Sequence, residues 1–200
     1  MTRNQRLNVK VTVTYEPPST GFDGKYPRPI TIHMYPIKDH EGPREGFRLY
    51  RRRGDEWEAC EDNTGCGYRL VDAPDVPIYV GLDAENFVSL DVSKPWVFEH
   101  QLESDAWWTP DEAAIGDTFR CRFKGTTLDW WDWGTLENHG DTVVTVPCWI
   151  AGMVVDPKDN GGRPKLVVPA SNFVEFSLVE QTCCNCFANQ FKFDLYDQEI

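Results

Sequence analysis

The segment from Leu128 to Gly134 is richest in side chains that could do chemistry. It reads Leu-Asp-Trp-Trp-Asp-Trp-Gly, so three tryptophans and two aspartates lie within five residues. Indole rings stack on sugar faces, and carboxylates accept hydrogen bonds from hydroxyl groups. The segment therefore predicts an exposed ligand-binding cluster for a glycan or a protein, formed by Trp130, Trp131, Asp132 and Trp133.

The alternative for this segment is that its indoles fill the hydrophobic core. On a regular strand, Trp131 and Trp133 point to one side, and Trp130 and Asp132 point to the other. We expect the first pair in the core and the second pair facing out or lining a cavity. Trp131→Ala should then cost about 3 to 5 kcal/mol, whereas Trp130→Ala should leave stability nearly intact but weaken a ligand.

Acid–base catalysis is a further possibility for the same region. Asp129, Asp132, Glu137 and His139 are candidate catalytic residues, because a histidine with nearby carboxylates can titrate near neutral pH. Together with an aromatic pocket, they would make a cofactor-independent isomerase, cyclase or hydrolase of small molecules. The alternative is that these residues are solvated turn residues after Gly134.

Spacing argues against a metal or another cofactor. Cys183, Cys184 and Cys186 could offer thiolates to a soft metal or form disulfides, but adjacent cysteines on an extended chain point opposite ways. The four histidines form no His-x-His or His-x₃-His pair, and His33 shares a predicted strand face with Thr31. We expect no metal site and no cofactor.

Composition indicates a single globular domain over residues 1–200. The chain has 40% hydrophobic residues and a formal net charge of −12, which repels a polyanion, so nucleic acid is not an expected partner. No run approaches the roughly 18 to 20 apolar residues of a membrane span, and the N-terminus lacks the apolar core of a secretory signal. Together with an odd number of cysteines, seven, these features predict a cytoplasmic protein without a membrane partner.

One basic cluster interrupts the acidic composition. It contains Arg44, Arg48, Arg51, Arg52 and Arg53, which could grip a phosphate or a carboxylate. Gly54-Asp55-Glu56 follows at once. The pattern favours a solvated hairpin with cross-strand charge pairs.

Alternation of apolar and polar residues is the dominant structural pattern. Val9, Val11, Val13 and Tyr15 share one face of a predicted strand, and we expect the three valines in the core. Similar strands are predicted at 30–35, 47–51, 68–71, 78–80, 87–90, 96–102, 118–124, 142–150, 173–179 and 191–196. Such short strands, with long loops between them, predict an all-β, antiparallel sandwich or barrel.

Two smaller expectations come from the same patterns. Thr109-Pro110-Asp111-Glu112 has the form of a capping box, and Gly116 would end the helix, so one short helical turn is predicted near 110–115. Cys121 and Cys148 each fall on an apolar strand face. We expect both to be buried free thiols.

Residues 86–123 resemble a known family. The strand Asn86-Phe87-Val88-Ser89-Leu90, the strand 96–102 and the strand that follows Ile115-Gly116 are similar to the immunoglobulin-like sandwich found beside fungal deuterolysin-type proteases and in a bacterial intracellular proteinase inhibitor. The whole chain also resembles proteins of filamentous fungi. The resemblance implies an immunoglobulin-like fold, but the absence of His-Glu-x-x-His means that it implies no protease activity.

Three functions remain as expectations. The first is a non-catalytic module that binds a protein or a glycan through loops and the tryptophan cluster. The second is the cofactor-independent enzyme. The third, suggested by the resemblance, is a proteinase inhibitor.

Overall fold

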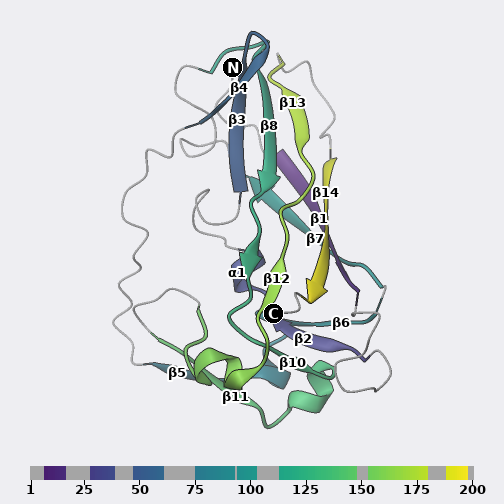
Figure 1. Ribbon diagram of the computed structural model, residues 1–200, viewed down its shortest axis with the longest axis vertical. Coiled ribbons are helices and arrows are strands. Elements are labelled where there is room, and N and C mark those ends of the chain that lie inside the picture. Colours follow the sequence, from purple (N-terminus) through teal and green to yellow (C-terminus); the bar gives the residue numbers. More distant parts are fainter. Residues whose placement is uncertain are drawn as a thin grey trace.

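The computed structural model describes residues 7–16, 28–38, 47–60, 75–92, 94–102, 113–147, 153–179 and 188–197 (Figure 1). These residues form mostly β-strands, which confirms the all-β prediction. The helical elements are short: α1 (Tyr35–Lys38) and the 3-10 helices η1 (Val80–Leu82), η2 (Leu136–His139) and η3 (Lys158–Gly162). Within the described ranges, no helix has the length and apolar character needed to cross a membrane.

The largest sheet has the order β7-β1-β14-β12-β9. Its strands are β1 (Leu7–Tyr15), β7 (Trp96–Leu102), β9 (Thr126–Thr127), β12 (Leu166–Val168) and β14 (Ala188–Asp197). Val11 and Val13 are fully buried, as their alternation predicts, whereas the side chain of Val9 lies outside the described part. β1 pairs antiparallel with β7 but parallel with β14. Among the described strand pairs, that of β1 with β14 departs from the antiparallel arrangement that was predicted and that the other pairs show, since strands so far apart in the chain have no hairpin to dictate their direction.

A four-stranded antiparallel sheet has the order β13-β8-β3-β4. Its strands are β3 (Phe47–Arg53), β4 (Glu56–Ala59), β8 (Thr118–Phe123) and β13 (Val174–Ser177), drawn in the upper half of Figure 1. Phe119, Cys121 and Phe123 point into the core because they alternate with Arg120 and Arg122 along β8. Along β8, one side is therefore apolar, and the other carries Arg120 and Arg122.

The predicted hairpin in the arginine run is present. β3 and β4 meet at Gly54, whose φ of +61° is readily accessible to glycine. Arg52 and Asp55 lie 3.7 Å apart, as do Arg53 and Glu58. Arg51 differs from the prediction of a solvated side chain: it is buried on the core side of β3, and its Nη2 donates to an Asp117 carboxylate oxygen 2.6 Å away.

Two small sheets lie at the opposite end of the molecule (Figure 1). One has the order β10-β2-β6, with β2 (Ile30–His33), β6 (Phe87–Leu90) and β10 (Trp131–Trp133). The other pairs β5 (Val76–Tyr79) with β11 (Val143–Val146). A small apolar cluster of Val80, Phe87, Trp130, Val144 and Val154 lies here, separate from the main core. The immunoglobulin-like arrangement stays a proposal from the sequence resemblance.

The helical turn predicted near 110–115 is not found in the part of that segment that is described. Ala113 and Ala114 are irregular, and Ile115 and Gly116 form a turn. Residues 109–112 lie outside the described residues, as do the predicted strand 68–71 and the cysteines at 183, 184 and 186. The strand predicted over 30–35 ends at His33, and helix α1 takes up Tyr35, because Pro36 is tolerated in a first helical turn.

Cys121 is a buried free thiol, as predicted, while Cys148 lies outside the described residues. Burial raises the pKa of Cys121 to about 12, so the thiol is protonated at neutral pH and is a poor nucleophile. We expect peptide mapping after brief treatment of the native protein with iodoacetamide at pH 8 to find Cys121 unmodified. Full modification of Cys121 under native conditions would contradict its burial.

Asp117 makes the free energy of unfolding depend on pH in the acid range. Its pKa is lowered because the Ala114 N–H donates to its carboxylate and Arg51 lies beside it, although burial acts in the opposite direction. A lowered folded-state pKa contributes stability that is complete above the ordinary value of 3.8 and is lost as the pH falls through the folded value. We expect the free energy of unfolding to fall more steeply below pH 3.8 in the wild type than in Asp117→Asn, measured by urea titration. Equal slopes would contradict this role.

Candidate binding surface

The tryptophan segment does not form the predicted exposed platform. Trp130 is 1% exposed and Trp131 is 4% exposed. Trp131 belongs to the main core, and its indole N–H donates to the Pro164 carbonyl oxygen at 2.9 Å. Trp130 belongs to the small cluster, with its ring edge-on to Phe87 and to His139 at centroid distances of 5.3 and 5.7 Å. The expectation that Trp130 faces out is therefore wrong, because an apolar cluster covers each side of the segment.

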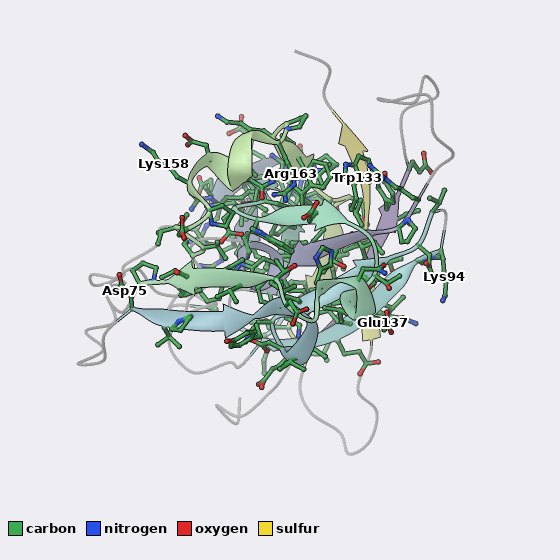
Figure 2. The ribbon with its side chains drawn as sticks, turned by 90° about the horizontal axis from the view of Figure 1, so that it is seen from below. Asp75, Lys94, Trp133, Glu137, Lys158 and Arg163 are labelled. Atoms are coloured by element: carbon green, nitrogen blue, oxygen red, sulfur yellow. The ribbon has the colours of Figure 1, made fainter. Side chains whose placement is uncertain are left out.

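Trp133 and Asp132 keep partial exposure, but both have partners within the chain. The Arg28 guanidinium lies 4.4 Å from the centroid of the Trp133 ring. An Asp132 carboxylate oxygen accepts a hydrogen bond from Arg163 Nη2 at 2.6 Å, and the other accepts from the Trp133 N–H. Figure 2 shows Trp133 and Arg163 in the same region of the molecule. These contacts give both residues a structural role.

The four proposed acid–base residues are not held together as one group. Asp132 pairs with Arg163, and His139 is buried with its Nδ1 3.1 Å from the Thr142 hydroxyl oxygen. Glu137 is exposed on η2, away from Arg163 in Figure 2, and a hydrogen bond from the Thr135 side chain lowers its pKa. Asp129 has a different histidine as its partner. The four-residue catalytic group is thus not supported by the observed contacts.

That different histidine is His33. Its Nδ1 lies 3.0 Å from both carboxylate oxygens of Asp129, and the two side chains are 3% and 5% exposed. The Val154 N–H also donates to Asp129, and the Phe87 ring packs against the imidazole at 4.9 Å. A carboxylate on Nδ1 fixes the orientation of the ring. The sequence interpretation missed this pair because 96 residues separate its members.

A second feature missed from the sequence is the outer face of the four-stranded sheet. Six of its side chains come from three strands: Arg48, Tyr50 and Arg52 from β3, Trp57 from β4, and Arg120 and Arg122 from β8. Tyr50 is directly opposite Arg120, and Arg48 is directly opposite Arg122. Phe173, just before β13, completes the set. We call these seven residues the arginine face.

Arg120 lies at the centre of the arginine face. Its guanidinium carbon is 4.2 Å from the ring centroid of Phe173, 4.5 Å from that of Trp57 and 5.2 Å from that of Tyr50. Each contact is a cation–π interaction, worth about 0.5 to 1 kcal/mol at exposed sites. The three rings therefore hold the guanidinium in a defined position.

Arg122 extends this arrangement along β8. Its guanidinium carbon lies 4.7 Å from the Phe173 centroid, so one ring contacts two arginines. Phe173 is itself 37% exposed. The Nε atoms of Arg120 and Arg122 are buried without a hydrogen-bond partner. Neither arginine forms an ion pair with a carboxylate among the residues that the structure describes.

The arginine face is a concentration of positive charge on a protein of net charge −12. It presents four guanidinium groups interleaved with three aromatic rings. Arg120 and Arg122 follow one another on the same side of β8, and Glu175 is the carboxylate directly opposite Arg120, without an ion pair between them. The arrangement can bind an anion, with guanidinium groups as hydrogen-bond donors and ring edges as apolar contacts. The alternation of Arg120 and Arg122 with buried residues was the sequence feature that could have revealed it.

The described residues do not meet the requirements of a metal site. Among the described residues, no group of three or more histidine, cysteine, aspartate or glutamate side chains is placed to hold a metal ion. Comparison of the chain with protein-family models, with curated proteins and with solved structures finds no match.

Proposed function

We propose that the protein is a non-catalytic binding module that recognises an acidic segment of a partner protein on its arginine face. The observation that carries this proposal is the position of Arg120 and Arg122. Both are held against aromatic rings, with no carboxylate partner among the described residues. A partner's carboxylates would supply the missing negative charge.

The composition of the arginine face supports a protein partner. Arginine, tryptophan and tyrosine are the residue types that most often contribute large binding energies at protein interfaces. Ring contacts that already hold a guanidinium in place reduce the entropy lost on binding. A glycan is less well supported, because Trp130 and Trp131 are buried in the core clusters.

The test is binding of a synthetic acidic peptide, acetyl-Asp-Glu-Gly-Glu-Gly-Glu-Asp-amide, by isothermal titration calorimetry. We expect binding that weakens as salt is raised, and a loss of affinity of about tenfold or more in Arg122→Gln. Lys158→Gln is the matched control, because it removes the same charge from an exposed position on η3. Absence of binding, or an equal loss in both variants, would contradict the proposal.

A second candidate function rests on the pair of His33 and Asp129. A buried histidine with both carboxylate oxygens 3.0 Å from Nδ1 is suited to acid–base chemistry on a small molecule. The test is a panel of p-nitrophenyl esters with the wild type and His33→Gln. Turnover that His33→Gln abolishes would favour this function, and equal turnover would exclude it for these substrates. The proteinase-inhibitor alternative stays a prediction that no contact in the described residues favours.

A further inference from the structure

We propose that the group bound at the centre of the arginine face is a phosphoryl group, carried by a phosphorylated segment of the partner protein. This inference rests on the proposed function and makes it more specific. It depends on the two arginines that share the Phe173 ring and on the residues that surround them.

Three arginines are neighbours on this face of the sheet. Arg120 is two residues away from Arg122 on the same side of β8, which corresponds to about 7 Å along a strand. Arg48 is directly opposite Arg122 on β3, where paired Cβ atoms are about 4.5 to 5.5 Å apart. Arg48 also has an interaction of its own, so Arg120 and Arg122 carry the argument. One carboxylate cannot compensate both of them.

A phosphoryl group matches this arrangement better than a carboxylate does. It carries a charge of about −1.5 to −2 at pH 7 and three strong acceptor oxygens, against a charge of −1 and two oxygens. Guanidinium groups bind phosphate with paired, parallel hydrogen bonds. Because both Nε atoms are buried, the terminal nitrogens are the groups left to donate, and both arginines keep partial exposure. Arg120 and Arg122 can thus donate to different oxygens of one phosphoryl group.

The surroundings favour a phosphorylated protein over a nucleic acid. Exposed carboxylates lie at the same part of the sheet: Asp55 in the turn after β3, and Glu175 on β13, directly opposite Arg120 although no ion pair joins them. A chain of phosphates that continued beyond the arginines would meet these acids and a protein of net charge −12. A polypeptide with one phosphoryl group carries its doubly charged group at one point, so that group can lie at the arginines while fewer negative charges reach the surrounding carboxylates.

The aromatic rings give the flanking peptide residues a place to pack. Trp57 and Tyr50 lie on one side of Arg120, and Phe173 lies between the two arginines. Tyr50 and Phe173 contact each other edge to face at 5.8 Å, which makes a continuous apolar rim. Such a rim excludes water around a charged contact and strengthens it.

Three matched peptides test the inference by isothermal titration calorimetry on the full chain. They are acetyl-Asp-Glu-Gly-X-Gly-Glu-Asp-amide, in which X is phosphoserine, glutamate or serine. We expect the phosphoserine peptide to bind at least tenfold more tightly than the glutamate peptide, and the serine peptide to bind most weakly. Arg122→Gln should abolish the preference for phosphoserine, whereas Lys158→Gln should retain it.

A second variant, Arg122→Lys, tests the inference even if Arg122→Gln folds poorly. It keeps the positive charge and most of the aliphatic chain but lacks the planar guanidinium group with its paired donors. We expect it to reduce the preference for phosphoserine over glutamate several-fold. Equal binding of the phosphoserine and glutamate peptides would overturn the phosphoryl inference but leave the proposed function standing. Absence of binding by all three peptides would overturn both. Tighter binding of an eight-nucleotide oligothymidylate than of the phosphoserine peptide would overturn the assignment to a protein partner.

Discussion

We expect Trp130→Ala to lower the free energy of unfolding by about 3 to 5 kcal/mol, the range typical for truncation of a buried large aromatic side chain. Trp130 is 1% exposed and packs between the rings of Phe87 and His139. The small apolar cluster contains few other large side chains to close the space that alanine would leave. The loss should equal or exceed that of Trp131→Ala, in the main core.

Urea titration followed by far-ultraviolet circular dichroism measures these losses. Trp133→Ala is the matched control, because Trp133 is a neighbouring indole that is only half-buried, with Arg28 over its ring. We expect its loss to be smaller than either of the other two. A loss in Trp130→Ala no larger than in Trp133→Ala would contradict the burial of Trp130 in a second core.

The sequence interpretation of this segment failed for a definite physical reason. Strand periodicity says that neighbouring side chains point to opposite sides, and Trp130 and Trp131 do belong to different apolar clusters. Periodicity does not say whether the second side faces water. Here β5 and β11 contribute Ile78 and Val144 to the cluster on that side, and their position depends on tertiary structure.

Most strands could be predicted from alternation alone. The predicted strands at 87–90 and 96–102 match β6 and β7, and β3, β8, β11, β13 and β14 overlap their predicted ranges. The predicted hairpin after Arg53 implied β4, and the tryptophan segment was treated as a strand, which β10 matches. The strands that were missed are β9 and β12. They have two and three residues, too few for an alternation of apolar and polar residues to be recognised.

The candidate binding surface could be predicted only in part. The hairpin of β3 and β4 was expected, and binding of a phosphate or a carboxylate by its arginines was the alternative that the sequence pattern did not favour. The position of the hairpin beside Arg120 and Phe173 was not expected, because β3 and β8 are about 70 residues apart and their register is not visible in one sequence. The same limit hid the contact of His33 with Asp129. Local pattern thus located the strands, whereas both candidate sites depend on long-range pairing.

Gly81 lies in η1, which contacts η2. Of the described glycines, it is the one at which an added Cβ would come closest to a neighbouring atom. A Cβ at this position would lie 2.7 Å from the Leu136 carbonyl oxygen and 2.8 Å from both the Gly140 nitrogen and the His139 carbonyl carbon. All three are backbone atoms, so no side-chain rotation can relieve the overlap. The two helical turns flank the small apolar cluster, because Val80 and Trp130 belong to it and His139 packs on Trp130.

We therefore expect Gly81→Ala to lower the free energy of unfolding by about 1 to 3 kcal/mol, the usual cost of overpacking, measured by the same urea titration. Gly140→Ala is a matched control from the same contact. Nothing lies within 4 Å of a Cβ there, and its backbone is right-handed helical, with φ −53° and ψ −37°. This substitution should be neutral or stabilise the protein by up to about 1 kcal/mol, since alanine restricts the unfolded chain. A Gly81→Ala protein as stable as Gly140→Ala would show that η1 and η2 can separate without loss, and that the small cluster does not depend on their contact.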